Sequence, residues 1–180
     1  MSADRPRAPR SVYGRLKATA ETAFLAMGRC ATVLRLTKVL TPEMALIRDW
    51  IGSLARGAPV RAFNDLRISP LALGHVLSAL LAIASDREGG IFQISGSGDV
   101  SYAEVARHLT RRLGISEMLV ESCAAIASGI PAEEVTAFTS LDVTRMERLC
   151  GFRPPDPGEV IEEVFGPAIL AALQSAERTA

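Results

Sequence analysis

Apolar residues recur along most of the chain at helical spacing, and short runs of β-branched and apolar residues interrupt this pattern. Spacings of three and four residues predict amphipathic helices, whereas short apolar runs bounded by Gly or Pro predict strands. The sequence therefore predicts alternating helices and short strands. The expected helices cover residues 11–27, 42–57, 70–84, 102–113, 116–128, 131–134, 142–150 and 159–173, and the expected strands cover residues 32–36, 60–63, 91–95 and 135–140.

Local signals mark several helix starts. Thr41-Pro42 offers a hydroxyl at the N-cap and a proline in the first turn. Ser101 and Glu104 have the spacing of a capping box. The helix over 70–84 is apolar nearly all round, which predicts a position deep in the fold. Gly96-Ser97-Gly98 resembles part of a dinucleotide-binding turn, but Ser101 stands at the third glycine position, so we reject that interpretation.

Composition limits the class of protein. With 180 residues, 48% of them hydrophobic, the chain can form a single domain around one core. A net charge of zero argues against a nucleic-acid partner. No apolar run is long enough to span a membrane and no signal peptide is apparent, so we expect a cytoplasmic protein. Cys30, Cys123 and Cys150 are isolated, and His75 and His108 lack a neighbouring ligand, so no metal site is predicted.

The first helix carries a candidate for proton chemistry. Tyr13 and Lys17 are four residues apart, so they share one side of the helix. A shielded ammonium beside a phenol favours the phenolate and lowers the phenol's pKa. An apolar stripe on the same helix predicts that the pair points inward. Its members are Leu16, Ala20, Ala23, Phe24 and Met27.

A Tyr and a Lys at this spacing also occur as an ordinary surface pair, and that alternative stays open. The chain has only two Tyr, and two of its twenty basic residues are Lys, so such a pair is rare by chance. A compact ammonium with a tunable pKa is something that the more abundant Arg does not supply. The functional interpretation is therefore favoured.

The residues from Pro9 to Glu21 resemble the Pro-x-x-x-Tyr-Gly-x-x-Lys-x-x-x-Glu helix of extended short-chain dehydrogenases/reductases. The likeness is greatest to dTDP-4-dehydrorhamnose reductase and related sugar-nucleotide reductases and epimerases. Four later stretches resemble the same family in the same order. They are Thr32–Thr37, Asp65–Pro70, Gly90–Gly96, and Leu141-Asp142 with Gly151–Pro154.

This resemblance implies an α/β fold: a partial Rossmann-like, NAD(P)-binding fold whose C-terminal portion carries a helical substrate-binding lobe. We expect one truncated domain over residues 1–180. Residues 11–40 would form the catalytic helix and its following strand, and residues 41–180 would form mostly the substrate-binding lobe. Only twelve residues precede Tyr13, so we expect the family's glycine-rich nucleotide-binding turn and its catalytic Ser or Thr to be absent.

The resemblance also implies residue roles. Tyr13 would be the general acid towards a sugar keto oxygen, and Lys17 would lower its pKa and hold the nicotinamide ribose of NAD(P)(H). Thr37 would line the cofactor, and Lys38 would line the substrate. Arg67 would meet the diphosphate of the nucleotide sugar, although a solvated turn arginine is an equal alternative.

Three functions stay open. The first is a sugar-nucleotide reductase or epimerase, active once a complementing N-terminal chain supplies the nucleotide-binding part. The second is a non-catalytic module that binds a sugar nucleotide, and the third is a helical interaction protein. Missing central strands would expose an apolar sheet edge, so we also expect self-association into a homo-oligomer.

Overall fold

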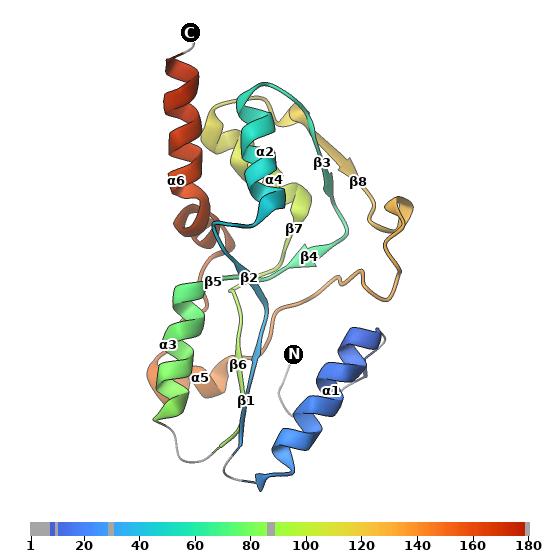
Figure 1. Cartoon of the computed structure of the whole chain (residues 1–180), viewed down its shortest axis with the longest axis vertical. Coiled ribbons are helices and arrows are strands. Elements are labelled where there is room, and N and C mark those ends of the chain that lie inside the picture. Colours follow the sequence, from blue (N-terminus) through green and yellow to red (C-terminus); the bar gives the residue numbers. More distant parts are fainter. Residues whose placement is uncertain (1–7, 10, 29–30, 86–88, 179–180) are drawn as a thin grey trace.

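The computed structural model describes residues 8–9, 11–28, 31–85 and 89–178, which form a mixed fold of helices and short strands (Figure 1). The elements in chain order are α1 (Val12–Leu25), β1 (Thr32–Leu36), β2 (Lys38–Leu40), α2 (Ala45–Ala55), β3 (Val60–Phe63), β4 (Arg67–Ile68), β5 (Pro70–Ala72), α3 (Leu73–Ala84), β6 (Gly90–Ile94), β7 (Val100–Ser101), α4 (Tyr102–Leu113), η2 (Glu117–Leu119), β8 (Val120–Cys123), η3 (Ile126–Ser128), α5 (Thr144–Cys150) and α6 (Pro157–Glu177).

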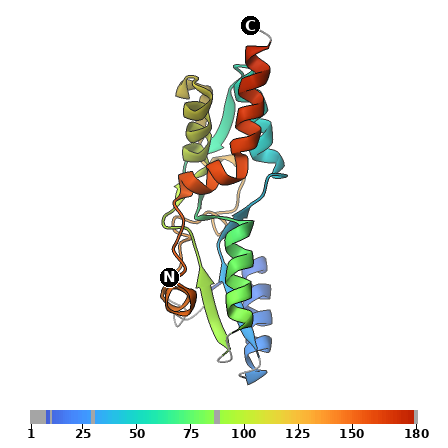
Figure 2. The ribbon, with the colours of Figure 1, turned by 90° about the vertical axis from the view of Figure 1, so that its left-hand side faces the viewer.

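The lower lobe in Figure 1 consists of α1, β1, α3, β6 and α5. β1 and β6 pair in parallel, from Thr32 opposite Gly90 to Leu36 opposite Ile94. Helices α1 and α3 lie on opposite faces of this pair, as Figures 1 and 2 both show. The core is small and lies on the α3 side of the strands. It consists of Leu71, Val76, Ala79, Ile83, Phe92, Ile94 and Met146.

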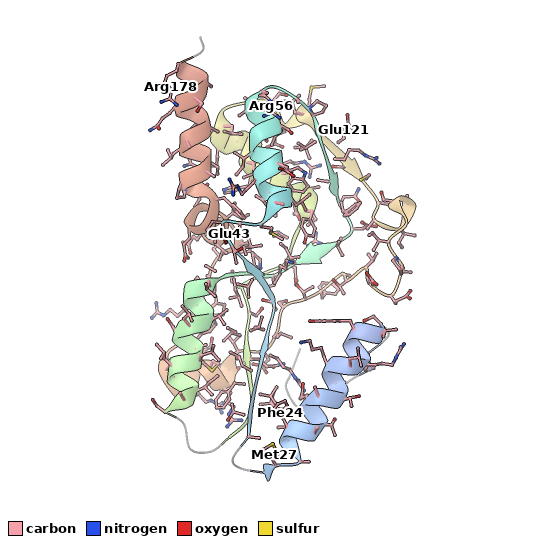
Figure 3. All side chains as sticks on the ribbon, in the orientation of Figure 1. Phe24, Met27, Glu43, Arg56, Glu121 and Arg178 are labelled. Atoms are coloured by element: carbon pink, nitrogen blue, oxygen red, sulfur yellow. The ribbon has the colours of Figure 1, made fainter. Side chains whose placement is uncertain are left out.

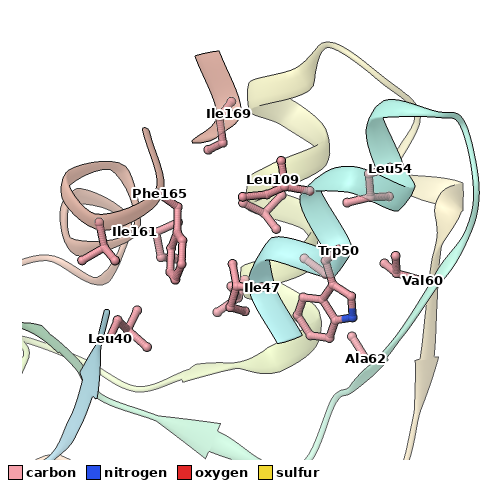
Figure 4. Packing of buried hydrophobic residues seen from close by; sticks show 14 of the residues in the cluster. Leu40, Ile47, Trp50, Leu54, Val60, Ala62, Leu109, Ile161, Phe165 and Ile169 are labelled. Atoms are coloured by element: carbon pink, nitrogen blue, oxygen red, sulfur yellow. The ribbon is translucent and has the colours of Figure 1, made fainter. Parts of the chain in front are cut away.

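The upper lobe consists of the parallel pair of β3 and β8, the helices α2 and α4 that pack on this pair, and α6, which packs on α2 and α4. Its core is larger, and Figure 4 shows how the side chains of three helices meet in it. Trp50 from α2 contacts the Tyr102 ring edge to face, with ring centroids 6.3 Å apart. The fully buried residues include Ile47, Leu54, Leu109, Phe165 and Ile169.

Short ladders join the two lobes. β2 pairs in parallel with β5, and β4 pairs antiparallel with β7. Near these ladders the buried hydroxyls of Ser69 and Ser95 lie 3.0 Å apart. The chain therefore crosses between the lobes several times, at a junction that is itself hydrogen-bonded.

Several predicted elements are confirmed. The strands at 32–36, 60–63 and 91–95 form, the last one residue earlier than expected. The helix over 102–113 forms with its capping box: Ser101 Oγ accepts the Glu104 N–H, and Glu104 accepts the Ser101 N–H.

Other predictions of elements were wrong. The second helix begins at Ala45 rather than at Pro42, because residues 41–44 close a turn from the Met44 N–H to the Thr41 carbonyl. The expected helix over 116–128 is replaced by η2, β8 and η3, since β8 pairs with β3. Residues 131–134 form turns rather than a helix, and 135–140 contain no strand.

The prediction that the helix over 70–84 lies deep in the fold was wrong. Residues 70–72 form β5 instead of its first turn, because they pair with β2. Only one face of α3 is buried, and the other is exposed although it is equally apolar. The exposed leucines are Leu73, Leu77, Leu80 and Leu81. Within the described residues, no helix is both long and apolar enough to cross a bilayer.

Candidate functional site

The Tyr13–Lys17 pair lies on the first turns of α1. Ser11 caps this helix by accepting the Gly14 N–H at 3.1 Å. The Lys17 Nζ lies 5.4 Å from the centroid of the Tyr13 ring, a cation–π distance. The helix therefore holds phenol and ammonium together, as their spacing predicts.

The prediction that this pair points inward was wrong. The Tyr13 side chain is 71% exposed, and Leu16 on the same helix is also exposed. Phe24 and Met27 at the end of α1 are exposed too (Figure 3). The half-buried residues of α1 are instead mostly small: Ser11, Gly14, Ala18, Glu21 and Leu25. Periodicity marks an apolar stripe, but it does not say whether a neighbouring element covers that stripe.

A two-pronged ion pair anchors α1 to the sheet. Glu21 accepts from Arg35 Nε at 3.1 Å and from Arg35 Nη2 at 2.6 Å. The two side chains are only 11% and 20% exposed, which strengthens the attraction relative to a surface pair. Tyr13, Lys17 and Glu21 follow one another at intervals of one turn along α1. The bonds between Glu21 and Arg35 therefore fix the rotation of α1 about its axis, and with it the side to which Tyr13 and Lys17 point. Sequence reasoning missed this contact, although Glu21 is part of the helix motif.

Thr37 and Gln93 carry buried oxygens without a partner. Thr37 lies directly after β1 and Gln93 lies in β6. Neither the Thr37 Oγ1 nor the Gln93 Oε1 has a hydrogen-bond partner among the described residues. Gln93 pairs in register with Arg35, so the two side chains share the sheet face that α1 covers. Buried polar atoms are normally satisfied. These two make the carboxyl ends of β1 and β6 a fitting place for a polar ligand. The next residue, Lys38, is exposed.

Arg67 has protein partners in the upper lobe. Its guanidinium donates to the Asp99 carbonyl at 3.2 Å and lies 3.7 Å from a Glu104 carboxylate oxygen. The Ser101 backbone N–H, with smaller help from Arg67, lowers the pKa of Glu104. Among the hydrogen bonds and ion pairs of the described residues, none joins Arg67 to Tyr13 or Lys17. Its contact with a diphosphate stays a prediction.

A carboxylate clamp holds a long loop against the junction. Asp99 accepts bonds from the backbone and hydroxyl groups of Thr139 and Ser140. Partial burial raises the pKa of Asp99, but these hydrogen bonds outweigh it and leave that pKa below its ordinary value. The Leu141 N–H donates to Ser95 Oγ at 3.1 Å, at the end of β6. No sequence pattern indicated this clamp, because its members lie about forty residues apart.

The described residues fit one end of a dinucleotide better than the other. The exposed Lys17 ammonium and the unpaired Thr37 hydroxyl suit a ribose and its neighbouring ring. Gly96, in the rejected glycine pattern, serves packing instead, because a Cβ there would lie 2.8 Å from the Pro70 carbonyl oxygen. Within the described ranges, no group of three metal-ligating side chains occurs.

The fold resembles solved sugar-nucleotide enzymes. One is the dTDP-glucose 4,6-dehydratase of Bacillus anthracis in complex with NAD, with a TM-score of 0.76, 18% identity, and coverage of 92% of this chain and 54% of that one. Another is the dTDP-4-dehydrorhamnose reductase of the same organism in complex with NADP, with a TM-score of 0.71, 17% identity, and coverage of 92% and 59%. The fold is therefore of the Rossmann-like α/β class, as predicted.

The sequence identifies the family within that class. The family model for the RmlD substrate binding domain matches residues 2–168, so the chain belongs to that family. A probable dTDP-4,6-dihydroxy-2-methyloxan-3-one 4-ketoreductase of Streptomyces antibioticus is 30% identical over 172 residues, which are 94% of this chain and 57% of that protein. The resemblance to sugar-nucleotide reductases and epimerases is confirmed. The chain spans only a little over half the length of these relatives.

Proposed function

We propose that this chain is the substrate-side part of an NAD(P)-dependent reductase or epimerase that acts on a nucleotide sugar. The observation that carries the proposal is the row of Tyr13, Lys17 and Glu21, tied to β1 through Arg35, in a chain of this family. The relatives' names point to deoxythymidine diphosphate sugars as the substrate class.

In this proposal Tyr13 donates the proton that a reduced sugar keto oxygen requires. The Lys17 ammonium stabilises the negative charge that develops on the phenol oxygen, because it already lies beside the ring. A general acid so placed contributes about 10²- to 10⁴-fold to the rate. Bound NAD(P)H supplies the hydride. Lys17 and Thr37 would hold the ribose end of that cofactor, through the ammonium and the unpaired hydroxyl.

Two basic residues are proposed to bind the nucleotide sugar. Lys38 is exposed at the start of β2, directly after Thr37, so its ammonium is accessible to an anion. Arg67 would exchange Glu104 for the diphosphate, to which a guanidinium makes paired hydrogen bonds. Proton transfer needs a site that excludes water, so a further nucleotide-binding part would have to cover the exposed Tyr13.

The exposure of Tyr13 favours a second candidate, a non-catalytic module that binds a sugar nucleotide. Such a module would use Lys38 and Arg67 without needing the phenol. Under both proposals the protein works in the cytoplasm, which agrees with the unpaired thiols of Cys123 and Cys150.

The test uses a fusion that joins this chain to the part of the Streptomyces antibioticus relative lying outside the match, in the order that the relative has. NADPH oxidation is followed with dTDP-4-dehydrorhamnose as substrate. We expect Tyr13→Phe to lower kcat by about 10²-fold or more. Tyr102→Phe, which removes the hydroxyl of the second of this chain's two tyrosines, should leave kcat within about twofold.

Calorimetry with dTDP-glucose separates the alternatives. Binding without any Tyr13-dependent NADPH oxidation would favour the non-catalytic module. If the fusion neither binds the nucleotide sugar nor oxidises NADPH, the proposed function is wrong.

A further inference from the structure

We propose that Phe138 is a substrate-contacting residue, whose ring packs on the sugar beside Tyr13 and selects a sugar with a methyl group over one with a hydroxymethyl group. Phe138 lies in the strap, which we define as residues 136–140 of the loop between β8 and α5. Asp99 is then a positioning residue that holds the strap. The inference rests on the proposed function and deepens it, because it names a chemical group of the substrate that this chain distinguishes.

The backbone is fixed on both sides of Phe138. Two residues earlier, the Thr136 carbonyl accepts from the Arg67 N–H at 3.3 Å. Directly after Phe138, the Thr139 N–H donates to Asp99 Oδ1 at 2.7 Å, and the Thr139 hydroxyl donates to the same oxygen. The backbone that carries the Phe138 side chain is therefore held between two anchors, although it belongs to a long loop.

The ring that this backbone carries is nevertheless open to solvent. The Phe138 side chain is 77% exposed, and it belongs to neither core of the described part of the chain. An exposed phenyl ring gives up the free energy that burial of its apolar surface would provide. A ring on an anchored backbone loses less conformational freedom on binding than a ring on a mobile loop. The combination therefore suits a contact with a ligand better than a packing role.

The strap lies near the end of α1 that carries Tyr13. Figure 3 labels Phe24 and Met27 at the lower end of α1, so Val12 and Tyr13 belong to its upper end. In Figures 1 and 2 the loop between β8 and α5 crosses the junction of the lobes just above that upper end. A sugar whose keto oxygen meets the Tyr13 hydroxyl would therefore lie between α1 and the strap.

The strap is also bonded to the arginine proposed to bind the diphosphate. Besides its backbone bond to Thr136, Arg67 donates from Nη1 to the Asp99 carbonyl at 3.2 Å. Arg67, Asp99 and the strap thus form one hydrogen-bonded unit. The diphosphate of a nucleotide sugar is joined directly to the sugar ring. An aromatic ring that lies near both Arg67 and Tyr13 therefore meets the sugar rather than the nucleobase.

The chemistry of the Phe138 ring favours a methyl group. A phenyl ring offers apolar surface and no hydrogen-bonding group, so it packs well on a methyl but leaves a hydroxyl unpaired. The Streptomyces antibioticus relative is named for a substrate whose ring carries a methyl group. An apolar pocket discriminates against an added hydroxyl by about 10²-fold at most. Because the Phe138 ring forms one side of the site, we expect about a tenth of that limit.

Calorimetry with two matched ligands tests the contact in the fusion described above. The ligands are dTDP-6-deoxyglucose and dTDP-glucose, which differ by one hydroxyl. We expect wild type to bind the deoxy sugar about 10-fold more tightly, and Phe138→Ala to bring the two dissociation constants within about twofold. Leu170→Ala is the matched control, because it truncates an exposed apolar side chain on α6 and should keep the 10-fold ratio.

A pair of variants at Thr139 tests the positioning role of Asp99. Thr139→Val keeps the shape of the side chain but removes the hydroxyl that donates to Asp99, whereas Thr139→Ser keeps the hydroxyl. We expect Thr139→Val to raise KM for dTDP-4-dehydrorhamnose about fivefold with kcat within about twofold, and to narrow the ratio between the two ligands. Thr139→Ser should retain both values. A purely structural role would lower the thermal midpoint of Thr139→Val and leave the ratio unchanged.

Other outcomes would overturn the inference. Equal affinity of wild type for the two ligands contradicts it, and so does an unchanged ratio in Phe138→Ala. If Phe138→Ala weakens dTDP itself as much as both sugar nucleotides, the ring contacts the nucleobase and the inference is wrong.

The inference and the proposed function can fail separately. A ratio that depends on Phe138, together with a kcat that Tyr13→Phe leaves unchanged, keeps the sugar contact and rejects the proposed proton donor. A Tyr13-dependent kcat with no effect of Phe138→Ala on the ratio does the reverse. Failure of the fusion to bind either ligand rejects both.

Discussion

The upper and lower lobes contain similar elements, a parallel strand pair with helices, but they close their cores differently. In the upper lobe α2 and α4 pack on β3 and β8, α6 packs on these two helices, and the large side chains of Phe165, Leu109 and Ile169 are fully buried. In the lower lobe α1 has no buried residue, and α3 buries only one of its two apolar faces. The helices of the upper lobe thus bury their apolar side chains against each other, whereas α1 and α3 in the lower lobe leave apolar side chains exposed.

This difference follows from what each helix packs against. A helix that is apolar on several sides needs neighbours on several sides. In the upper lobe the helices are each other's neighbours, as Figure 4 shows around Phe165 and Leu109. The Glu21–Arg35 pair and small residues hold α1 to β1, and the large apolar side chains of this helix stay exposed. The lobe with the candidate catalytic pair is therefore the one whose helices leave more apolar surface exposed.

The largest expected effect contrasts a sealed and an open apolar position. Phe165→Ala removes a ring from the upper core and should lower the free energy of unfolding by about 3 to 5 kcal/mol. Leu77→Ala on the exposed face of α3 should change it by less than about 0.5 kcal/mol in the chain alone. Urea unfolding of both variants measures the contrast. Similar losses would mean that α3 is covered in solution.

The junction between the lobes comes next. Gly96→Ala would place a Cβ 2.8 Å from the Pro70 carbonyl oxygen and 3.0 Å from Ser69 Oγ, so the backbone would have to shift. We expect a loss of about 1 to 3 kcal/mol, seen in the thermal midpoint. Gly98→Ala is the matched control, because nothing lies within 4 Å of its added Cβ. A neutral Gly96→Ala would show that the two lobes are joined less tightly than the contacts indicate.

A smaller and more local effect is expected at the anchor of α1. Glu21→Gln keeps the shape of the side chain but removes the charge that holds Arg35, at a cost of about 1.5 kcal/mol. The loss should appear as faster amide exchange within α1, while the upper lobe keeps its protection. Glu121→Gln, at an exposed position on β8, should change neither. Unchanged exchange in α1 would mean that the ion pair does not position the Tyr13–Lys17 row.

The smallest effect concerns pH. Hydrogen bonds from Thr139 and Ser140 keep the pKa of Asp99 below its ordinary value in spite of partial burial. A carboxyl group with a lowered folded-state pKa stabilises the fold above its unfolded pKa of about 3.9, and this contribution is lost as the pH falls through the folded value. We expect Asp99→Asn to cost about 1 kcal/mol near pH 7.

The gap between wild type and Asp99→Asn should shrink as the pH falls below the unfolded pKa of about 3.9 and close only below the lower folded-state pKa, where the carboxyl is protonated in both states. Chemical unfolding at several pH values measures this gap. A gap that stays constant into acid would show that the charge of Asp99 does not hold the loop.

Local signals in the sequence predicted the elements that local interactions decide. The capping box of Ser101 and Glu104 and the β-branched run at 32–36 were both predicted at the observed place. Failures occurred where a distant strand competed with a helix. Residues 70–72 form β5 and residues 120–123 form β8 instead of helix. Pairing of β5 with β2 and of β8 with β3 outweighed the local helical preference.

The sequence by itself determined the family, the helix that carries Tyr13 and Lys17, and the distance between those residues along it, because a helix fixes i and i+4 neighbours without outside help. Only the tertiary structure decided which way that helix faces, which strand pairs with β1, and that Asp99 clamps a loop forty residues away. Burial and strand pairing depend on elements far apart in the chain, and no local pattern of residues encodes them.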